Sequence, residues 1–283
     1  MSVWYCIPSC RPIPEVQDCL ERWRAQGYKI ALLRQGDPVE CDLLIPTGEY
    51  LGWARSTNIL TREVLRRDSE CTWVCAGGDD YWPDPTKPAD EIAEECSEHF
   101  RKAAWPMCWH WDSKYNTPEE ALAAGAYAEQ KPQALWSAAL ADMFSTWGVC
   151  QPTGDRYGDS PEARKEWGEE RGAEIDRIAG SPWMGREWCK SAYLGIGPLW
   201  PGYHHLYADE ELCAVAEKLG VYWRRRDLTQ YHNHPCRTDP KGYGVYREGH
   251  LAKLYDPERW RIEQMHFEER KAKGFPGCEP CPR

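Results

Sequence analysis

The sequence contains no apolar run long enough to cross a membrane. A spanning helix needs about 20 consecutive apolar residues, and the 283-residue chain has no run of that length. Its first residues, MSVWYCIPSC, lack a basic region followed by a long apolar stretch, so we expect no signal peptide. No internal repeat or low-complexity segment is visible. These absences predict a cytoplasmic protein without a membrane partner, folded as one domain.

Positive charge is also in deficit. The 35 Lys and Arg residues stand against 45 Asp and Glu residues, which gives a formal net charge of −10. Such a total argues against a surface coated with phosphate-binding groups. The deficit is uneven, because residues 219–283 hold 13 basic against 9 acidic residues, a local net charge of +4. That segment could face an anionic partner, or it could be an ordinary solvated surface of mixed charge.

The 14 cysteines do not require disulfides, because a chain of 283 residues can bury its own core. Several lie inside apolar patterns, where a thiol behaves as a small hydrophobic group, and we expect them to be reduced. Cys278 and Cys281 have the spacing of metal ligands, but a second such pair is missing. We therefore interpret residues 266–283 as a flexible tail behind a domain of residues 1–265, with a zinc site as the alternative.

The first hundred residues alternate between strand and helix patterns. Apolar runs predict strands at 3–8, 28–34, 42–46 and 71–76. Amphipathic spacing predicts helices at 14–26, 59–65 and 92–100. This alternation predicts an α/β fold with a mostly parallel central sheet flanked by helices. After about residue 105 the sequence turns to stretches rich in glycine, proline and aromatic residues, which predict long loops with a binding task.

The stretch GGDDYWPDP, residues 77–85, directly follows the last of these strands. Adjacent carboxylates repel each other, and burying them is costly unless positive charge lies nearby. Asp79 and Asp80 fall beyond the carboxyl end of a strand, where parallel sheets bind ligands. Mg²⁺ or Mn²⁺ suits such oxygen ligands. The alternative is a solvated turn.

Two later motifs carry further candidate side chains. ADEEL, residues 208–212, opens a predicted helix, and YHNH, residues 231–234, adds two imidazoles that would favour Mn²⁺. Each motif is ordinary by itself, since acidic residues favour the first turn of a helix and HNH could end a solvated strand. The order of the three motifs along the chain is what points to a function.

In that order the motifs resemble those of the family 2 glycosyltransferases, nucleotide-sugar enzymes with the GT-A fold. IPSCRP is similar to the opening strand of the family, and GWARSTN to a G-x-x-x-A-x-N segment. GGDDYWPD is similar to the metal motif, GSPWMGRE to a G-S-P stretch with a basic residue, ADEEL to an acidic motif and YHNH to a downstream histidine. The resemblance covers about residues 2–235.

The resemblance implies a GT-A-like (Rossmann-like) fold with an elaborated C-terminal half. A nucleotide-binding half would span about residues 1–105, and an acceptor-binding half about residues 106–265. It implies inverting transfer with Asp209 as the catalytic base. Mn²⁺ or Mg²⁺ would be the cofactor, held by Asp79, Asp80, His232 and His234.

The resemblance also assigns residues to the two substrates. The donor is implied to be a nucleotide sugar, best a UDP-sugar, with contacts from Pro8, Arg11, Asp37, Gly52, Arg55, Asn58, Gly78 and Asp79. The acceptor would be contacted by Trp183, Arg186, Asp155 and Arg156. Tryptophans in the same loops, Trp82, Trp183 and Trp200, could stack on a sugar or base, or could simply pack in the core.

The chain departs from the family pattern at three positions. Gly77 stands where the family has the first aspartate of its metal motif, and Ala208 stands where it has a glutamate. The aspartate that would contact uracil has no clear match beyond Asp37. The first departure leaves a second hypothesis open, a nucleotide-sugar-binding protein without turnover. A third hypothesis is a metal-dependent phosphoesterase or nuclease that uses the same carboxylates.

The acceptor is suggested by three blocks, at 148–159, 180–189 and 204–223, that look like those of phage-encoded glycosyltransferases. They imply a 5-hydroxymethylpyrimidine in duplex phage DNA as the acceptor and the host cytoplasm as the location. The basic run RRR at 224–226, with the basic residues that follow it, could contact DNA. A carbohydrate, lipid-linked or protein acceptor is the alternative.

Overall fold

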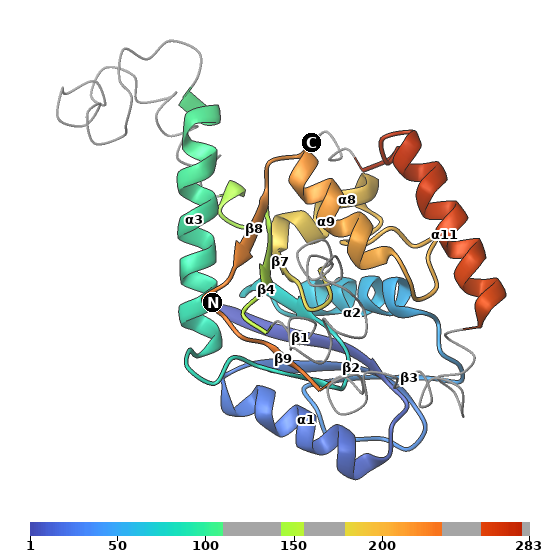
Figure 1. Cartoon of the computed structure of the whole chain (residues 1–283). Helices are drawn as coiled ribbons and strands as arrows, with labels where there is room; N and C mark the ends of the chain where they lie inside the picture. Colours follow the sequence, from blue (N-terminus) through green and yellow to red (C-terminus); the bar gives the residue numbers. More distant parts are fainter. Residues whose placement is uncertain (110–142, 156–178, 234–255, 279–283) are drawn as a thin grey trace, which may run out of the picture.

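The computed structural model describes residues 1–109, 143–155, 179–233 and 256–278 (Figure 1). At its centre lies a seven-stranded sheet of order β3-β2-β1-β4-β7-β6-β8. Its strands are β1 (Ser2–Ser9), β2 (Lys29–Gln35), β3 (Leu43–Thr47), β4 (Cys71–Ala76), β6 (Val149–Pro152), β7 (Trp183–Gly185) and β8 (Tyr222–Arg225). Only β7 runs antiparallel to its neighbours. The predicted α/β fold with a mostly parallel sheet is confirmed.

Helices flank this sheet on both faces. They are α1 (Ile13–Ala25), α2 (Trp53–Arg67), α3 (Ala89–Trp109), α8 (Arg186–Gly195), α9 (Ala208–Lys218) and α11 (Pro257–Ala272). In Figure 1, α1 lies on the opposite side of the sheet from α2, α8 and α9. A small second sheet pairs β5 (Tyr81–Trp82) antiparallel with β9 (Tyr231–His232).

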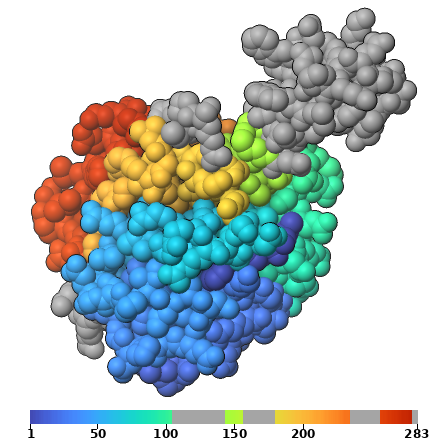
Figure 2. All heavy atoms as spheres, turned by 180° about the vertical axis from the view of Figure 1, so that it is seen from behind, coloured from blue at the N-terminus to red at the C-terminus, as the bar shows by residue number. Residues whose placement is uncertain are grey.

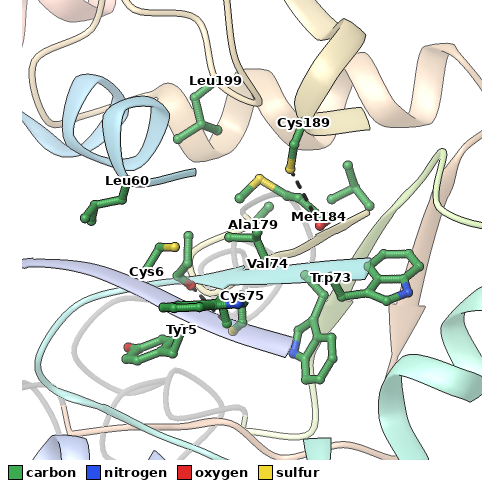
Figure 3. Close-up of a cluster of buried hydrophobic side chains, with 14 of the residues drawn as sticks. Tyr5, Cys6, Leu60, Trp73, Val74, Cys75, Ala179, Met184, Cys189 and Leu199 are labelled. Carbon is green, nitrogen blue, oxygen red and sulfur yellow. Dashed lines mark hydrogen bonds between the residues drawn. The ribbon is translucent and has the colours of Figure 1, made fainter. Parts of the chain in front are cut away.

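The core is built on both faces of β1 and β4, which are buried along their lengths. Tyr5 of β1 stacks on Trp23 of α1, with ring centroids 3.6 Å apart. Figure 3 shows Tyr5 on one side of the sheet and Leu60 and Leu199 on the other. Because both faces are covered, these strands read as continuous apolar runs, which is why the sequence pattern predicts them well. Gly27, at a φ of +86°, lies just after α1, where the sequence predicts the end of this helix.

The prediction of long loops after about residue 105 was wrong for residues 183–195. Residues 183–185 form β7 in the middle of the sheet, and residues 186–195 form α8. The helix ends where Tyr193 and Leu194 adopt positive φ angles of 48° and 58°. A three-residue strand between two partners takes its stability from its neighbours, so its own sequence pattern carries little signal.

The predicted boundary between domain and tail, at residue 266, falls inside helix α11. Residues 266–272 continue α11, and Phe267, Arg270, Phe275 and Cys278 are all buried. Figure 2 shows α11, in red, packed against the segment coloured yellow. Cys278 is a free thiol, and Cys281 lies outside the described residues.

The other described cysteines are free thiols as well, and most of them are buried. Burial raises the pKa of the Cys19 and Cys71 thiols above the usual range, so these groups are neutral packing residues rather than nucleophiles. In the described part of the chain, no helix combines the length and apolar character needed to cross a bilayer.

Candidate functional site

Asp79 and Asp80 lie beyond the carboxyl end of β4, and a side chain supplies the positive charge between them. Arg11, just after β1, donates from Nε to Asp79 Oδ1 at 2.7 Å. Its Nη2 donates to Asp80 Oδ2 at 3.3 Å. A guanidinium fork suits paired carboxylates. The structure therefore brings the predicted nucleotide-binding arginine into direct contact with the predicted metal ligands.

Ser9 completes the surroundings of Asp79. Its hydroxyl donates to Asp79 Oδ2 at 2.5 Å and accepts from Arg34 Nη1 at 3.2 Å. Burial raises the pKa of Asp79, and the contacts with Arg11 and Ser9 oppose that rise. Because the net change is a rise in the pKa, loss of hydration is the dominant effect on this carboxyl group.

The two glycines before these aspartates are needed by the packing of the turn. A Cβ on Gly77 would lie 2.8 Å from the Tyr5 hydroxyl, and one on Gly78 would lie 2.5 Å from Asp80 Oδ1. The Tyr5 hydroxyl itself donates to the carbonyl of Gly78 at 2.6 Å. A larger residue at either position would therefore displace the Tyr5 hydroxyl or the Asp80 carboxylate.

The histidine motif lies beside the acidic motif. Tyr81 of β5 pairs with His232 of β9, and their rings stack with centroids 3.9 Å apart. This places His232 Nε2 3.6 Å from Asp80 Oδ2. The backbone N–H of Asn233 donates to the carbonyl of Asp80 at 2.8 Å, which ties the two segments together. His234 lies outside the described residues.

Asp155 borders the same place. Its carboxylate accepts from the backbone N–H of His232 at 2.7 Å, so it positions β9. This contact was not expected from the sequence, which assigned Asp155 to an acceptor. Arg156 lies outside the described residues.

Asp209 is the second residue of the ADEEL motif and lies in the first turn of α9. It is half-buried, and burial raises the pKa of its carboxyl group. Its Oδ1 accepts from the N–H of Glu210 at 3.0 Å, and its carbonyl accepts from the N–H of Ala179 at 3.3 Å. The next residue, Gly180, is so close to β5 that a Cβ there would lie 2.8 Å from the Tyr81 hydroxyl. Residues 179–180 thus link α9 to the strand that stacks on His232.

Trp53 and His205 make a second link to the acidic turn. The indole N–H of Trp53 donates to the carbonyl of Gly77 at 3.2 Å, and its backbone N–H donates to the carbonyl of His204 at 2.7 Å. Burial lowers the pKa of His205 to about 4, while the field of Asp80 opposes this shift. Sequence reasoning missed His205, although it stands just before the acidic motif.

Helix α11 holds that histidine loop in place. The carboxylate of Glu263 accepts from the backbone N–H groups of His204, His205 and Leu206, at 3.0, 3.3 and 2.6 Å. A carboxylate that accepts several backbone N–H groups is a strong local anchor. Sequence analysis did not single out Glu263.

Two residues predicted to contact the acceptor lie elsewhere. Trp183 is fully buried in β7 and donates from its indole to Gln230 Oε1 at 2.6 Å. Arg186 donates from Nη1 to the carbonyls of Asp68 and Cys71, at the amino end of β4. That edge is opposite to the one that carries Asp79. In the described structure both residues make contacts within the fold, and their assignment to the acceptor stays a prediction.

The GWARSTN segment, residues 52–58, was predicted to contact the nucleotide sugar, and its residues also make contacts within the protein. Asn58 is buried, donating to the carbonyl of Leu199 at 2.8 Å and accepting from its N–H at 3.1 Å. Gly52 packs so closely that a Cβ there would lie 2.1 Å from the carbonyl oxygen of His204. Arg55 is exposed and donates to the carbonyl of Pro201 at 3.1 Å. In the described structure Gly52, Arg55 and Asn58 therefore contact loops of the protein itself, and the segment reaches the acidic turn through Trp53.

Two other predicted residues do lie at the edge that carries Asp79. Pro8 is near the carboxyl end of β1, paired with Leu33 of β2. Asp37 is exposed in the turn after β2, and its backbone carbonyl accepts from Arg34 Nε at 3.0 Å. The third aspartate of the acidic stretch, Asp84, is buried and caps Thr86, so it has a structural role.

The predicted aromatic and basic contacts are mostly engaged within the protein. Trp82 stacks on Tyr231 and lies under the guanidinium of Arg22. Trp200 is covered by Arg270 at 3.7 Å. Of the basic run, Arg225 is buried and ion-paired.

A divalent cation at the acidic turn would need oxygen or nitrogen ligands. Asp79, Asp80 and His232 are ligands of suitable type. In the described arrangement, however, Arg11 takes both carboxylates. No three His, Cys, Asp or Glu side chains are grouped as a metal site among the residues that the structure describes. A divalent ion would therefore have to displace Arg11 to bind here.

This competition is testable with Arg11→Gln. We expect the variant to bind Mn²⁺ at least about tenfold more tightly than the wild type, because two adjacent carboxylates would lose their cation. Calorimetric titration with MnCl₂ would measure it. The control is Arg22→Gln, which removes an exposed arginine paired with Asp18. Equal Mn²⁺ affinity in Arg11→Gln and wild type would show that Arg11 does not compete with a metal.

A scan of the chain against protein-family models finds no match, and a search of curated proteins finds no significant match. The function is therefore proposed from the site itself.

Proposed function

We propose that the protein is an inverting glycosyltransferase of GT-A-like fold that moves a sugar from a nucleotide-sugar donor, a UDP-sugar, to an acceptor hydroxyl. The observation that carries this proposal is the meeting of Arg11, Asp79, Asp80 and His232 beyond the carboxyl ends of β1 and β4. Parallel α/β sheets bind ligands at that edge. Three of the motifs that resemble the family, IPSCRP, GGDDYWPD and YHNH, contribute these side chains from distant parts of the chain.

In the proposed reaction, negative charge develops on the leaving diphosphate as the bond between sugar and phosphate breaks. Arg11 is the cationic side chain beside the acidic turn, and its fork suits phosphate oxygens as well as carboxylates. Mn²⁺ or Mg²⁺, when bound, would supply further countercharge to the diphosphate. His232 would border the donor from β9.

Asp209 is proposed as the base that accepts the proton of the attacking hydroxyl. Its raised pKa means that it holds a proton more strongly than an exposed aspartate does, which suits a general base. In-line attack on the anomeric carbon by a hydroxyl so activated inverts the configuration at that carbon. The released group is a nucleoside diphosphate.

The proposed acceptor is a 5-hydroxymethylpyrimidine in phage DNA. Its support is the net positive charge of residues 219–283. Within that segment Arg224 pairs with Glu217 and Arg225 with Glu95, so a DNA surface would depend on the other basic residues. A carbohydrate or protein acceptor is the alternative of the same reaction class.

The decisive experiment uses nucleoside mass spectrometry. The protein is incubated with a pool of nucleotide sugars, MnCl₂ and duplex DNA that carries 5-hydroxymethylcytosine or 5-hydroxymethyluracil. A hexose or pentose mass gained by the modified base would support the full proposal. Hydrolysis of one nucleotide sugar without modified DNA would keep the transferase and move the acceptor to another class.

A second candidate is a nucleotide-sugar-binding protein without turnover. It is favoured by Gly77 at the position of the first aspartate and by the engagement of both remaining carboxylates with Arg11. It predicts that a nucleoside diphosphate binds while neither transfer nor hydrolysis occurs. Cleavage of DNA or nucleotide without a sugar donor would instead favour a phosphoesterase.

A further inference from the structure

Among the residues that the structure describes, three arginines are almost completely buried, and they differ in their partners. Arg225 pairs with Glu95 and Asp227, and Arg270 pairs with Glu211. Arg34 is only 4% exposed, and among the described residues no carboxylate lies within ion-pair distance of it. A buried charge without a counter-charge is costly, so such a residue calls for an explanation.

The contacts of Arg34 are with neutral groups. Its Nε donates to the carbonyl of Asp37 at 3.0 Å, and its Nη1 donates to the hydroxyl of Ser9 at 3.2 Å. These contacts hold the guanidinium in one orientation but leave its charge unbalanced. Ser9 in turn donates to Asp79, so the guanidinium lies one hydroxyl away from the acidic turn.

The position of Arg34 is that of a ligand-facing residue. It lies at the carboxyl end of β2, opposite Ser9 of β1 in the parallel register. Two residues further along the chain lies Gly36, an exposed residue at a φ of +108°. A Cβ on Gly36 would meet Arg34 Nη2 at 3.9 Å and no other described atom within 4 Å apart from its chain neighbours. The exposed Gly36 therefore places no side chain beside Nη2.

We propose that Arg34 is a diphosphate-binding residue, the second guanidinium of the site beside Arg11, and that the counter-charge of Arg34 is the nucleoside diphosphate. This inference rests on the proposed function and extends it to a residue that the sequence resemblance did not include. A fixed, buried fork donates to phosphate oxygens in a bidentate manner without losing further side-chain entropy. The two guanidinium groups are connected through Ser9 and Asp79: Arg34 donates to the Ser9 hydroxyl, which donates to Asp79, and Asp79 accepts from Arg11.

The first test compares thermal stabilities without ligand. Arg34→Met removes a buried charge that no carboxylate balances, so its melting temperature is expected to be equal to or higher than that of the wild type. The matched control is Arg270→Met, which leaves Glu211 buried without its cation and should melt lower. If Arg34→Met melted as low as Arg270→Met, Arg34 would be a structural residue and the inference would be overturned.

The second test measures binding by calorimetry with UDP, inorganic pyrophosphate and uridine. Arg34→Met is expected to bind UDP and pyrophosphate about 10- to 100-fold more weakly than the wild type, with uridine affinity unchanged. Arg34→Lys keeps the charge but loses the guanidinium fork. Its affinity for UDP and pyrophosphate should lie between those of the wild type and Arg34→Met.

The outcomes separate this inference from the proposed function. Equal affinity of wild type and Arg34→Met for UDP and pyrophosphate would overturn the inference and leave the proposed function in place. An equal loss for uridine would also overturn it, because the contact would then be with the base. If the wild type bound none of the three probes, the proposed function would fail together with the inference.

Discussion

Asp209→Asn is expected to lower the rate of sugar transfer by about 10²- to 10⁴-fold, the range by which a positioned general base accelerates a reaction. Nucleotide binding should stay within about twofold, since the contacts that we assign to the nucleotide come from Arg11 and Arg34. The asparagine oxygen can still accept from the N–H of Glu210, so the turn is preserved. Transfer assays and calorimetry with UDP would measure the two effects separately.

The pH dependence gives an independent check on Asp209. Because burial raises its pKa, the base is protonated over a wider acidic range than an exposed aspartate, and the wild-type rate should fall as the pH drops through that raised pKa. The folded state binds this proton more tightly than the unfolded chain does, so ionisation of Asp209 destabilises the fold as the pH rises above about 3.9, the usual value. Asp209→Asn should therefore not lower the melting temperature at neutral pH.

The matched control for this prediction is Glu210→Gln, in the same helical turn. It removes one carboxylate without touching the proposed base, and its transfer rate should resemble that of the wild type. Full activity in Asp209→Asn would show that another group accepts the proton. A loss of nucleotide binding in Asp209→Asn would instead place this residue in the donor site.

Arg270→Met is expected to reduce the free energy of unfolding by about 3–5 kcal/mol, the usual cost of removing one partner from a buried ion pair. Arg270 donates from Nε and Nη2 to both carboxylate oxygens of Glu211, at 2.8 and 2.7 Å. The side chain of Glu211 is fully buried and also accepts from the Tyr203 hydroxyl at 2.7 Å. Denaturant titration would measure the loss.

Two further variants test whether the unpaired buried charge causes the loss of stability in Arg270→Met. Lys273→Met removes an exposed i,i+4 partner of Glu269 on the same helix and should change stability by less than about 0.5 kcal/mol. The double variant Glu211→Leu with Arg270→Met should recover much of the loss, because it leaves no unpaired buried charge. If Arg270→Met were as stable as Lys273→Met, the buried pair would not hold α11 against α9.

This pair matters for the site because α9 carries Asp209. Glu263, on the same face of α11, holds the loop that contains His205. Separation of α11 from α9 would therefore disturb both Asp209 and the histidine loop, and we expect Arg270→Met to lose transfer activity at temperatures below its global unfolding.

The order of elements in the first hundred residues was predictable. Strands β1 and β4 are buried on both faces, and α1 turns Val16, Leu20 and Trp23 to the core, so local patterns there agree with the tertiary fold. The acidic turn after β4 could also be recognised, because adjacent carboxylates need a positive partner. In the sequence, the acidic turn could be related to the later histidine motif only through the order of the motifs along the chain.

The second half was less predictable for two physical reasons. β7 has three residues and is stabilised by β4 and β6 on its two sides, so its own pattern is too short to identify it. Helix α11 turns Glu263, Phe267 and Arg270 inward, and two of these three residues are charged. A search for apolar periodicity cannot find a helix that is anchored mainly by ion pairs and hydrogen bonds.

The sequence by itself determined the α/β class, the parallel strands around β1 and the presence of a charged turn that needs a cation. It could not determine that this cation is Arg11, because Arg11 and Asp79 meet only when β1 and β4 pair in parallel. The same holds for Arg34, whose burial and neutral partners follow from the register of β1 and β2. Residue types and local patterns reside in the sequence, but which charges face each other is decided by strands that pair across long stretches of chain.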